Sequence, residues 1–379
     1  MDRGRSDKMM KTSQEILLKL IRISLWGPDN EVLASAPEWD KVLLLAKQQT
    51  VLGLVADSIP HLPQEFRPDP QTSSKLHARA ISICRSHSLL NRKIADLKST
   101  LDNHGIHSVL FKGQGVAMNY QNPMIRQCGD IDMYVGERNF EKTLEILKPS
   151  SDEKASDYKN QKHFNLLDNG VDIEIHRIAE TVPGLRRNRL FQEWTLKHLE
   201  GKDLHVVQIG GASVNLPPHQ FNALYIMNHA WHHFVNGGIG LRQLCDWAMF
   251  LHRHHSDIDP DVLREDLNSF GLSRAWQILA GVAVEYLGLP AEECPLYTGK
   301  FSLKSSMMID VIWSEGNFGF YSADSKKLRP AGHFAGKLHS FTKNTRRIGR
   351  VFSISPADIT LTWIFYFITG MRNVFVRIK

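Results

Sequence analysis

The sequence predicts an α+β protein in which a small mixed β-sheet is flanked by an N-terminal and a C-terminal helical region. Apolar residues recur at helical spacing through residues 12–104 and again from Pro217 onward. Between these regions, short apolar runs alternate with turn residues, which is typical of strands. We therefore expect an N-terminal helical region (1–104), a small α+β core (105–216) and a C-terminal helical domain (217–379).

The N-terminal region is predicted to be helical throughout. The apolar stretch EILLKLIRISLW is interrupted by Lys19 and Arg22. This gives the amphipathic spacing of a helix and not the unbroken apolar core of a signal peptide. Thr12 followed by Glu15 has the pattern of a capping box that would start this helix. Helical spacing continues through 37–59 and 73–105, and Gly105 is placed as the C-terminal stop of the second of these.

The middle of the chain changes to strand-like patterns. Asn169-Gly170 and Gly210-Gly211 each separate two apolar runs, which is a strong hairpin signal because these residues tolerate positive φ. The elements expected in order are a strand at 106–111, a KGQG turn leading into a short helix at 116–120, a strand at 130–135, a helix at 139–148, and the two hairpins.

The last third of the chain is predicted to be helical again. The expected helices are 218–236, 239–255, 260–270, 272–287, 303–315, 330–345 and 356–375, with a turn-like break at 314–321. The apolar run 359–371 is shorter than the roughly 20 residues that span a bilayer. A buried last helix is favoured over a membrane-surface helix, although the basic stretch 343–350 precedes it.

Composition and charge limit the function classes. The net charge of +6, from 46 basic and 40 acidic residues, suits an anionic substrate such as a nucleotide and is too small for a nucleic-acid footprint. No nucleic-acid-binding motif is present, so no nucleic-acid partner is expected. The four cysteines are scattered without a CxxC pair, which excludes a Cys-based zinc or redox motif and favours a cytoplasmic location.

The stretch GDIDMYV carries two carboxylates on one predicted strand. Side chains alternate along a strand, so Asp130 and Asp132 share one face with Tyr134, while the apolar side chains share the other. Two neighbouring carboxylates repel each other unless a cation lies between them. Because Mg²⁺ prefers one or two carboxylates together with phosphate oxygens, this pair predicts a magnesium site that holds a triphosphate.

A third carboxylate is available on the strand VDIEIH. Asp172, Glu174 and His176 share one face of it, and Glu174 reaches the same metals if this strand pairs with 130–135. Asp172 is the rival ligand on the same face. The alternative for Glu174 is a place on the exposed face of an edge strand, without a metal.

The turn FKGQG lies between a predicted strand and a helix. Gly113 and Gly115 let the backbone approach a ligand closely, and a following helix N-terminus favours phosphate. The nearest cations are Lys112 and Arg126, each of which could instead have a structural role.

Together these residues resemble the nucleotidyltransferase superfamily with the DNA polymerase β-like fold, and more closely an uncharacterised bacterial family within it. The matching elements are Lys112-Gly113, Arg126, DIDMYV and EIH, with similar helices around WDKVLLLAKQQTVLGLV, ALYIMNHAWHHF and LRQLCDWAMFL. The resemblance covers most of residues 37–255. One departure is Gln114, which stands where the superfamily usually has a second glycine or a serine.

The resemblance implies a magnesium-dependent enzyme, with Mn²⁺ as the substitute ion, that moves an NMP from an NTP to an acceptor and releases pyrophosphate. AMP from ATP is the favoured group, and the acceptor would be a small molecule, a sugar or a protein. The implied metal ligands and catalytic residues are Asp130, Asp132 and Glu174, and the implied nucleotide-binding residues are Lys112, Gly113, Gln114, Gly115 and Arg126. We expect no membrane-surface contact.

Two other functions stay open. His229 and His233 lie four residues apart on a predicted helix and, with Asp246, could form a histidine–metal phosphohydrolase site. Hydrogen bonding between helices is the favoured role for these histidines, because the HExxH glutamate is missing, and Asp246 could pair with Arg242. The other possibility is a catalytically degenerate nucleotide-binding protein, which the Gln114 departure favours.

Overall fold

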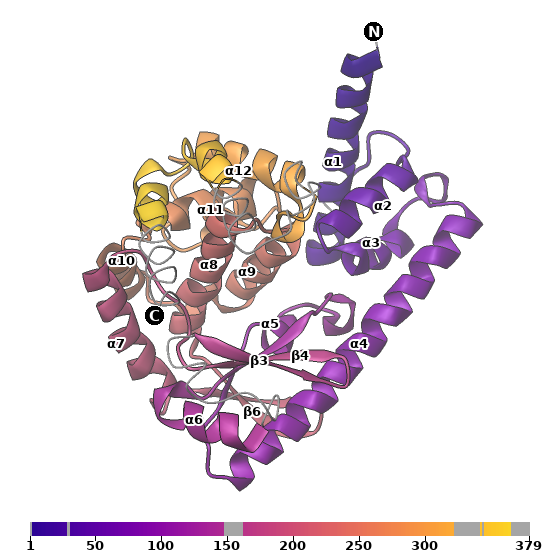
Figure 1. Ribbon diagram of the computed structural model, residues 1–379. Coiled ribbons are helices and arrows are strands. Elements are labelled where there is room, and N and C mark those ends of the chain that lie inside the picture. Colours follow the sequence, from indigo (N-terminus) through magenta and orange to yellow (C-terminus); the bar gives the residue numbers. More distant parts are fainter. Residues whose placement is uncertain (1, 29–30, 148–161, 322–341, 343–344, 365–379) are drawn as a thin grey trace.

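The computed structural model describes residues 2–28, 31–147, 162–321, 342 and 345–364. It confirms the α+β prediction, because helices surround a small mixed β-sheet (Figure 1). Most of the helices form one body, the sheet lies below it in this view, and the long helix α4 runs along the edge of both (Figure 1).

The N-terminal helices are α1 (Asp2–Trp26), α2 (Trp39–Gln48), α3 (Leu52–Ser58) and α4 (Pro70–Asn103). The predicted capping box was wrong, because α1 begins at Asp2 and Thr12 lies inside it. The helical run 37–59 is divided into α2 and α3, because Thr50 adopts a φ of 59°, which no helix accommodates.

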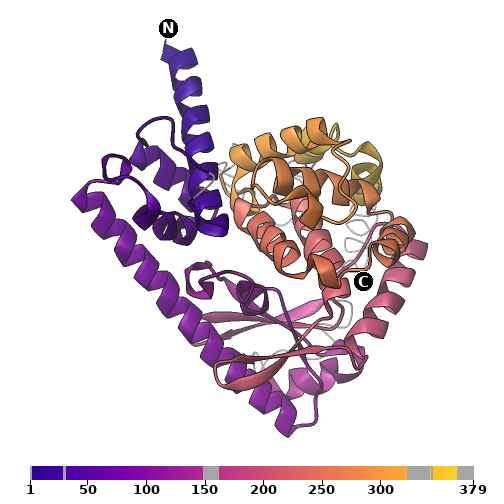
Figure 2. The same ribbon diagram turned by 180° about the vertical axis from the view of Figure 1, so that it is seen from behind.

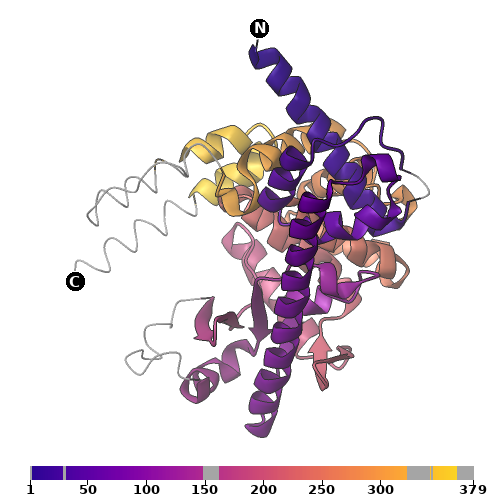
Figure 3. The same ribbon diagram turned by 90° about the vertical axis from the view of Figure 1, so that its right-hand side faces the viewer.

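Helix α4 has a defined start and stop. The side chain of Asp69 accepts hydrogen bonds from the backbone N–H groups of Gln71 and Thr72, and Pro70 occupies the first helical position. Gly105, with a φ of 66°, follows the last turn, as predicted. Leu90, Ile94 and other apolar residues in the second half of α4 pack against the sheet, and Figure 3 shows the helix passing alongside it.

The main sheet has four strands in the order β1-β2-β4-β3, which are β1 (Val109–Phe111), β2 (Asp130–Tyr134), β3 (His163–Asp168) and β4 (Val171–His176). Strand β2 is antiparallel to β1 and parallel to β4. Asn169 and Gly170 both have positive φ between β3 and β4, which confirms the first hairpin. The second predicted hairpin is also confirmed, as β5 (His205–Ile209) and β6 (Ala212–Leu216).

The two faces of the sheet have different surroundings. Ile131, Met133, Ile173 and Ile175 form one core with α4 and with Phe140 of α6 (Gly136–Leu147). The alternating residues of β2 and β4 face the other way, toward the larger helical body. This alternation separates the apolar side chains, which hold the sheet on α4, from the polar ones described below.

The C-terminal helices are α8 (His219–Asn236), α9 (Leu241–His254), α10 (Pro260–Phe270), α11 (Ser273–Glu285) and α12 (Ser302–Glu315), and each ends within two residues of its prediction. Helix α7 (Leu185–Leu199) precedes them and was not predicted. Residues 345–351 and 356–364 are also helical, while most of the predicted helix 330–345 lies outside the described residues. Among the described helices, none combines the length and the apolar run needed to cross a membrane.

One hydrophobic core joins the two ends of the chain. Leu17 and Val55 of the N-terminal helices belong to the same buried cluster as Trp247 and Leu279 of the C-terminal helices. Figure 2 shows the N-terminal helices beside the C-terminal helical body. Gln49 adds polar contacts between them, since its side chain donates to the carbonyl of Ile312 at 3.0 Å and accepts from the N–H of Leu241 at 3.1 Å.

Candidate active site

All three predicted carboxylates line one cavity of about 340 Å³. Asp130 and Asp132 come from β2 and Glu174 comes from β4. Helices α8 and α9 supply the facing residues, among them His229, His233 and Arg242. The cavity therefore lies between the polar face of the sheet and the helical body.

The strand register explains why these carboxylates meet. In the parallel pair, Asp132 is opposite Glu174 and Asp130 is opposite Asp172. The pairing of β4 with β2, which Glu174 needs to reach the other two carboxylates, is thus present. Asp172 is exposed and does not line the cavity, so of the two rivals on β4 it is Glu174 that the structure brings to the other carboxylates.

Asp132 is the most deeply buried of the three, with 2% of its surface exposed. Its Oδ1 lies 2.8 Å from Nζ of Lys112 and 2.8 Å from Nε2 of His176, which donates to it. Burial alone raises the pKa of Asp132, but the ammonium of Lys112 and the hydrogen bond from His176 outweigh it and hold the pKa below its usual range. Asp132 is therefore ionised, and both of these contacts use the same oxygen.

Asp130 has a different electrostatic environment. Burial raises its pKa, and the neighbouring charge of Asp132 raises it further, against the smaller opposing effect of Lys112. A carboxylate in this position gains from any added positive charge. The pair on β2 thus has the repulsion that its sequence predicted, and Lys112 relieves it only in part.

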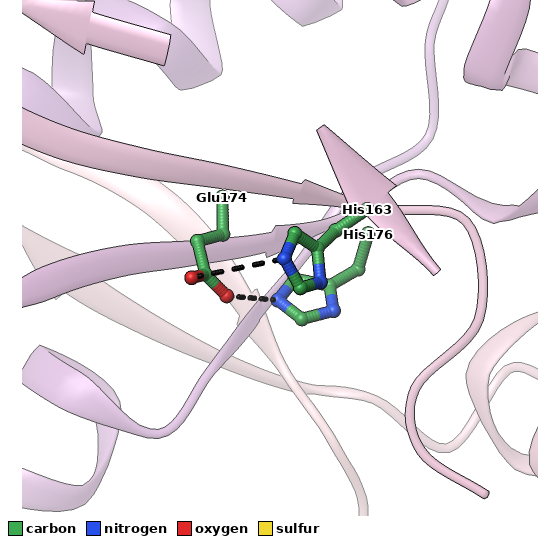
Figure 4. A group of neighbouring side chains, drawn as sticks. All are labelled: His163, Glu174 and His176. Carbon is green, nitrogen blue, oxygen red and sulfur yellow. Dashed lines mark ion pairs between the residues drawn. The ribbon is translucent and has the colours of Figure 1, made fainter. Parts of the chain in front are cut away.

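Glu174 lies beside two histidines, as Figure 4 shows. Its carboxylate is 3.4 Å from Nε2 of His176 and 3.9 Å from Nε2 of His163. Burial raises the pKa of Glu174, but the hydrogen bond from His176 and the charges of the two histidines together outweigh it, and the net shift is downward. The ligand atoms of these three side chains lie within 4.8 Å of one another, a spacing that could hold a metal ion.

Glu180 and Lys162 are important residues that the sequence analysis missed. Glu180 is fully buried, and it binds Nζ of Lys162 at 2.9 Å and Nδ1 of His229 at 3.3 Å. Burial raises the pKa of Glu180, but Lys162 and His229 lower it well below its usual range. Glu180 follows β4 in an irregular segment, where no periodicity marks it, so only the tertiary structure could have identified it.

His229 connects the two acidic centres. Its Nε2 lies 3.3 Å from Nζ of Lys112 while its Nδ1 faces Glu180, an arrangement that suits a neutral ring accepting from lysine and donating to glutamate. Burial and the charge of Lys112 hold the pKa of His229 well below its usual range. Burial and Lys112 likewise lower the pKa of His233 to about 4.

Asp246 is bound by other residues than the sequence suggested. It accepts from Nε of Arg126 at 2.7 Å, from Nη2 of Arg126 at 2.6 Å and from the hydroxyl of Tyr120 at 2.8 Å. The pairing of Asp246 with Arg242 was therefore wrong. In the described part of the chain, Asp246 does not form a metal-binding group with His229 and His233.

The KGQG turn places its residues in different environments. Lys112 and Gly113 line the cavity with φ values of 46° and 44°, a conformation that favours glycine at the second position. Gln114 and Gly115 are buried in the short helix α5 (Gly113–Ala117) and are not among the residues that line the cavity. A Cβ at Gly115 would lie 2.7 Å from the side chain of Leu216, so this glycine permits packing against β6.

Comparisons with known proteins support part of the interpretation drawn from the sequence. The model of a family described as "Uncharacterised nucleotidyltransferase" matches residues 35–288, which include every predicted site residue. An antigenic nucleotidyltransferase-like protein from Paracoccidioides brasiliensis is 13% identical, over 51% of this chain and 91% of that chain, with a TM-score of 0.27. A TM-score this low carries no weight for the fold. No curated protein matches the chain significantly.

Proposed function

The chain belongs to the family of uncharacterised nucleotidyltransferases, whose model matches more than half of it, and we propose that it transfers an NMP from an NTP to an acceptor with release of pyrophosphate. The observation that carries the proposal is the convergence of Asp130, Asp132 and Glu174 on one cavity. AMP is the favoured group, and a sugar, another small molecule or a protein is the favoured acceptor.

The donor set fits Mg²⁺. Three carboxylates on adjacent strands supply the hard oxygen ligands that this ion prefers, and the raised pKa of Asp130 marks a site that lacks positive charge. Lys112 and His176 both contact Asp132 through its Oδ1. When bound, Mg²⁺ would neutralise phosphate charge, and Mn²⁺ is the substitute because His163 adds a nitrogen donor beside Glu174.

The cations and histidines of the cavity suit a triphosphate. Lys112, Lys162 and Arg242 line the cavity together with three histidines of α8, which are His229, His232 and His233. Cations and N–H donors that converge on one cavity stabilise phosphate oxygens, and they do so more strongly away from bulk water. Arg126 also lines the cavity, but its guanidinium already binds Asp246, so we propose that it mainly supports the wall.

The residues of the chain would act chiefly by positioning. Lys112 and His176 orient Asp132, and Glu180 orients Lys162 and His229. Glu174 is ionised at neutral pH because its pKa is lowered, so it can accept the proton of the acceptor hydroxyl or bind the metal. Gly113 would let the backbone approach the phosphates, as the resemblance implies.

The superfamily assignment forms part of the proposal. A mixed sheet that presents Asp-x-Asp on one strand and a third carboxylate on the next supports the DNA polymerase β-like nucleotidyltransferase superfamily, of which we propose a bacterial member. Four free cysteines support a cytoplasmic location. No membrane-surface contact or nucleic-acid partner is proposed.

Transfer can be tested by the fate of two labels. The protein is incubated with Mg²⁺, a panel of sugars, sugar phosphates and proteins, and ATP labelled at either the α or the γ phosphate. We expect the α label on one acceptor and the γ label in pyrophosphate. Release of the γ label as inorganic phosphate would instead indicate a phosphohydrolase and would contradict the proposal.

A nucleotide-binding protein without transferase activity is the second candidate. It is favoured by the two positive partners that Asp132 already has, since Lys112 and His176 must share this carboxylate with any metal. In the same experiment such a protein would retain bound ATP and transfer neither label.

A further inference from the structure

One aromatic side chain in the cavity has no role in the transfer chemistry. Phe318 lines the cavity and is 41% exposed, although a large apolar side chain gains from burial. Its ring lies edge-on to the ring of His233, with 5.4 Å between the centroids. Phe318 belongs to the short 3₁₀ turn Asn317–Gly319, which follows α12.

The backbone of Phe318 is strained. Its φ is 52°, a left-handed value that costs free energy for any residue with a Cβ. Five non-glycine residues in the described part of the chain have positive φ, and two of them, Lys112 and Phe318, line this cavity. Strain of this kind persists where surrounding structure enforces it, and it is concentrated at functional sites.

Contacts outside the ring hold Phe318 in place. A Cβ at Gly319 would lie 2.3 Å from the carbonyl oxygen of Gly237, and a Cβ at Gly238 would lie 2.8 Å from the nitrogen of Gly319. The turn Asn317–Gly319 and the loop between α8 and α9 therefore pack backbone against backbone. The side chain of Asn317 also accepts from Nε2 of Gln243 at 2.9 Å. The turn is thus held by backbone packing, and it presents the partly exposed ring of Phe318, which also contacts the ring of Phe320, to the cavity.

A continuous series of contacts joins the ring of Phe318 to the carboxylates. Asp132 binds Lys112, Lys112 lies 3.3 Å from His229, the rings of His229 and His233 are 4.4 Å apart, and His233 contacts Phe318. The cavity therefore has a charged part and an aromatic part along one wall. A nucleotide has the same two parts, a charged phosphate chain and a flat aromatic base.

We propose that the ring of Phe318 stacks against the base of the bound nucleotide. The inference rests on the proposed function, because it takes an NTP as the occupant of the cavity. Stacking on an aromatic ring is available to every base, so Phe318 contributes affinity for the nucleoside end of the ligand and not for its phosphates.

The test compares two ligands that share a triphosphate. Binding of ATP and of inorganic tripolyphosphate is measured by calorimetry with Mg²⁺ for the wild type and for Phe318→Ala, Phe318→Leu and Phe318→Trp. Phe352→Ala is the matched control, because Phe352 is 45% exposed, close to the exposure of Phe318, but does not line the cavity. Thermal unfolding of each variant shows that it is folded.

We expect Phe318→Ala to bind ATP about tenfold to a hundredfold more weakly, the usual effect of removing one stacking ring, and to bind tripolyphosphate like the wild type. Phe318→Trp should retain ATP affinity, Phe318→Leu should not, and Phe352→Ala should match the wild type.

Three results would overturn the inference while leaving the proposed function in place. They are unchanged ATP affinity in Phe318→Ala, an equal loss for both ligands in that variant, and full affinity in Phe318→Leu. If the wild type binds neither ATP nor tripolyphosphate, the proposed function fails and the inference fails with it.

Discussion

At the residue scale, Asp132 shows how the negative charge of a buried carboxylate is compensated without a ligand. Two positive groups, Lys112 and His176, lie 2.8 Å from one of its oxygens. Burial of a carboxylate is tolerable only with such partners. A divalent ion that enters the cavity must share Asp132 with them, and Lys112 would then be available to a phosphate.

Glu174 and Asp172 provide a matched pair of variants on one strand face. We expect Glu174→Gln to weaken Mg²⁺-dependent ATP binding or transfer by at least about 100-fold, since a lost ligand should cost more than the 10–100-fold typical of its outer partners. Asp172→Asn should match the wild type, because Asp172 is exposed outside the cavity. Calorimetry and the α-label assay measure both effects, and equal losses in the two variants would remove Glu174 from the site.

Glu180 gives a prediction about stability. Glu180→Gln should lower the free energy of unfolding by about 3 kcal/mol, near the low end for a broken buried ion pair because Lys162 is 26% exposed. Glu137→Gln is the control, since the side chain of Glu137 is 68% exposed in its ion pair with Arg177 and should change stability by less than about 1 kcal/mol. Urea unfolding measures both, and similar values for the two variants would contradict the assigned role.

The same variant has a predicted pH dependence. The folded protein holds the pKa of Glu180 well below its usual value, so the unfolded chain takes up the proton first as the pH falls. The stabilisation is complete above the unfolded pKa of about 4.3 and is lost as the pH falls toward the folded pKa. The difference in stability between the wild type and Glu180→Gln should therefore be constant near pH 7 and shrink below about pH 4.

At the element scale, the parallel pairing of β2 and β4 explains how far the sequence could predict the site. The alternation in DIDMYV and VDIEIH places carboxylates on one face, and Asn169-Gly170 marks the hairpin that leads into β4. Local rules of this kind were sufficient for the acidic side of the cavity. The register then opposes Asp132 and Glu174, as the prediction required.

The cationic and aromatic parts of the cavity could not be predicted in this way. Lys162 lies just before β3 and Phe318 lies in a 3₁₀ turn, and both reach the cavity only because distant elements pack together. The break at Thr50 was missed for a related reason. Its positive φ accompanies tertiary contacts of the neighbouring Gln49 and not a local turn signal such as Asn-Gly.

The KGQG turn yields a prediction that separates strain from function. Gly113→Ala and Gly170→Ala should each lower stability by about 1–2 kcal/mol, because both glycines have positive φ and neither substitution meets a close contact. Only Gly113→Ala should weaken ATP binding, because Gly113 lines the cavity and Gly170 lies in the distant β3–β4 turn. Thermal unfolding and calorimetry test the pair, and unimpaired ATP binding in Gly113→Ala would exclude this turn from the phosphate site.

At the scale of the whole molecule, the cavity depends on the way helices from both ends of the chain pack together. Their apolar side chains form one cluster, and that cluster supports α8 and α9 above the sheet (Figure 1). The sequence predicted the helices of both regions but not this shared core, because spacing reports which face of a helix is apolar and not what covers it.

Gln49 tests this shared core. Gln49→Ala would leave the N–H of Leu241 and the carbonyl of Ile312 buried without their partner, which should cost about 2–3 kcal/mol. We expect chemical unfolding to remain a single transition that is shifted to lower denaturant. Two separate transitions in the wild type, followed by tryptophan fluorescence and circular dichroism, would show instead that the two ends unfold independently.

The central claim is that the carboxylates of β2 bind a divalent ion together with a nucleoside triphosphate. The most direct test is calorimetric binding of each NTP, with Mg²⁺ and with EDTA, to the wild type and to the folded double variant Asp130→Asn/Asp132→Asn. We predict binding to the wild type that requires Mg²⁺ and is lost in the double variant. Equal Mg²⁺-dependent binding by the two proteins would contradict the account.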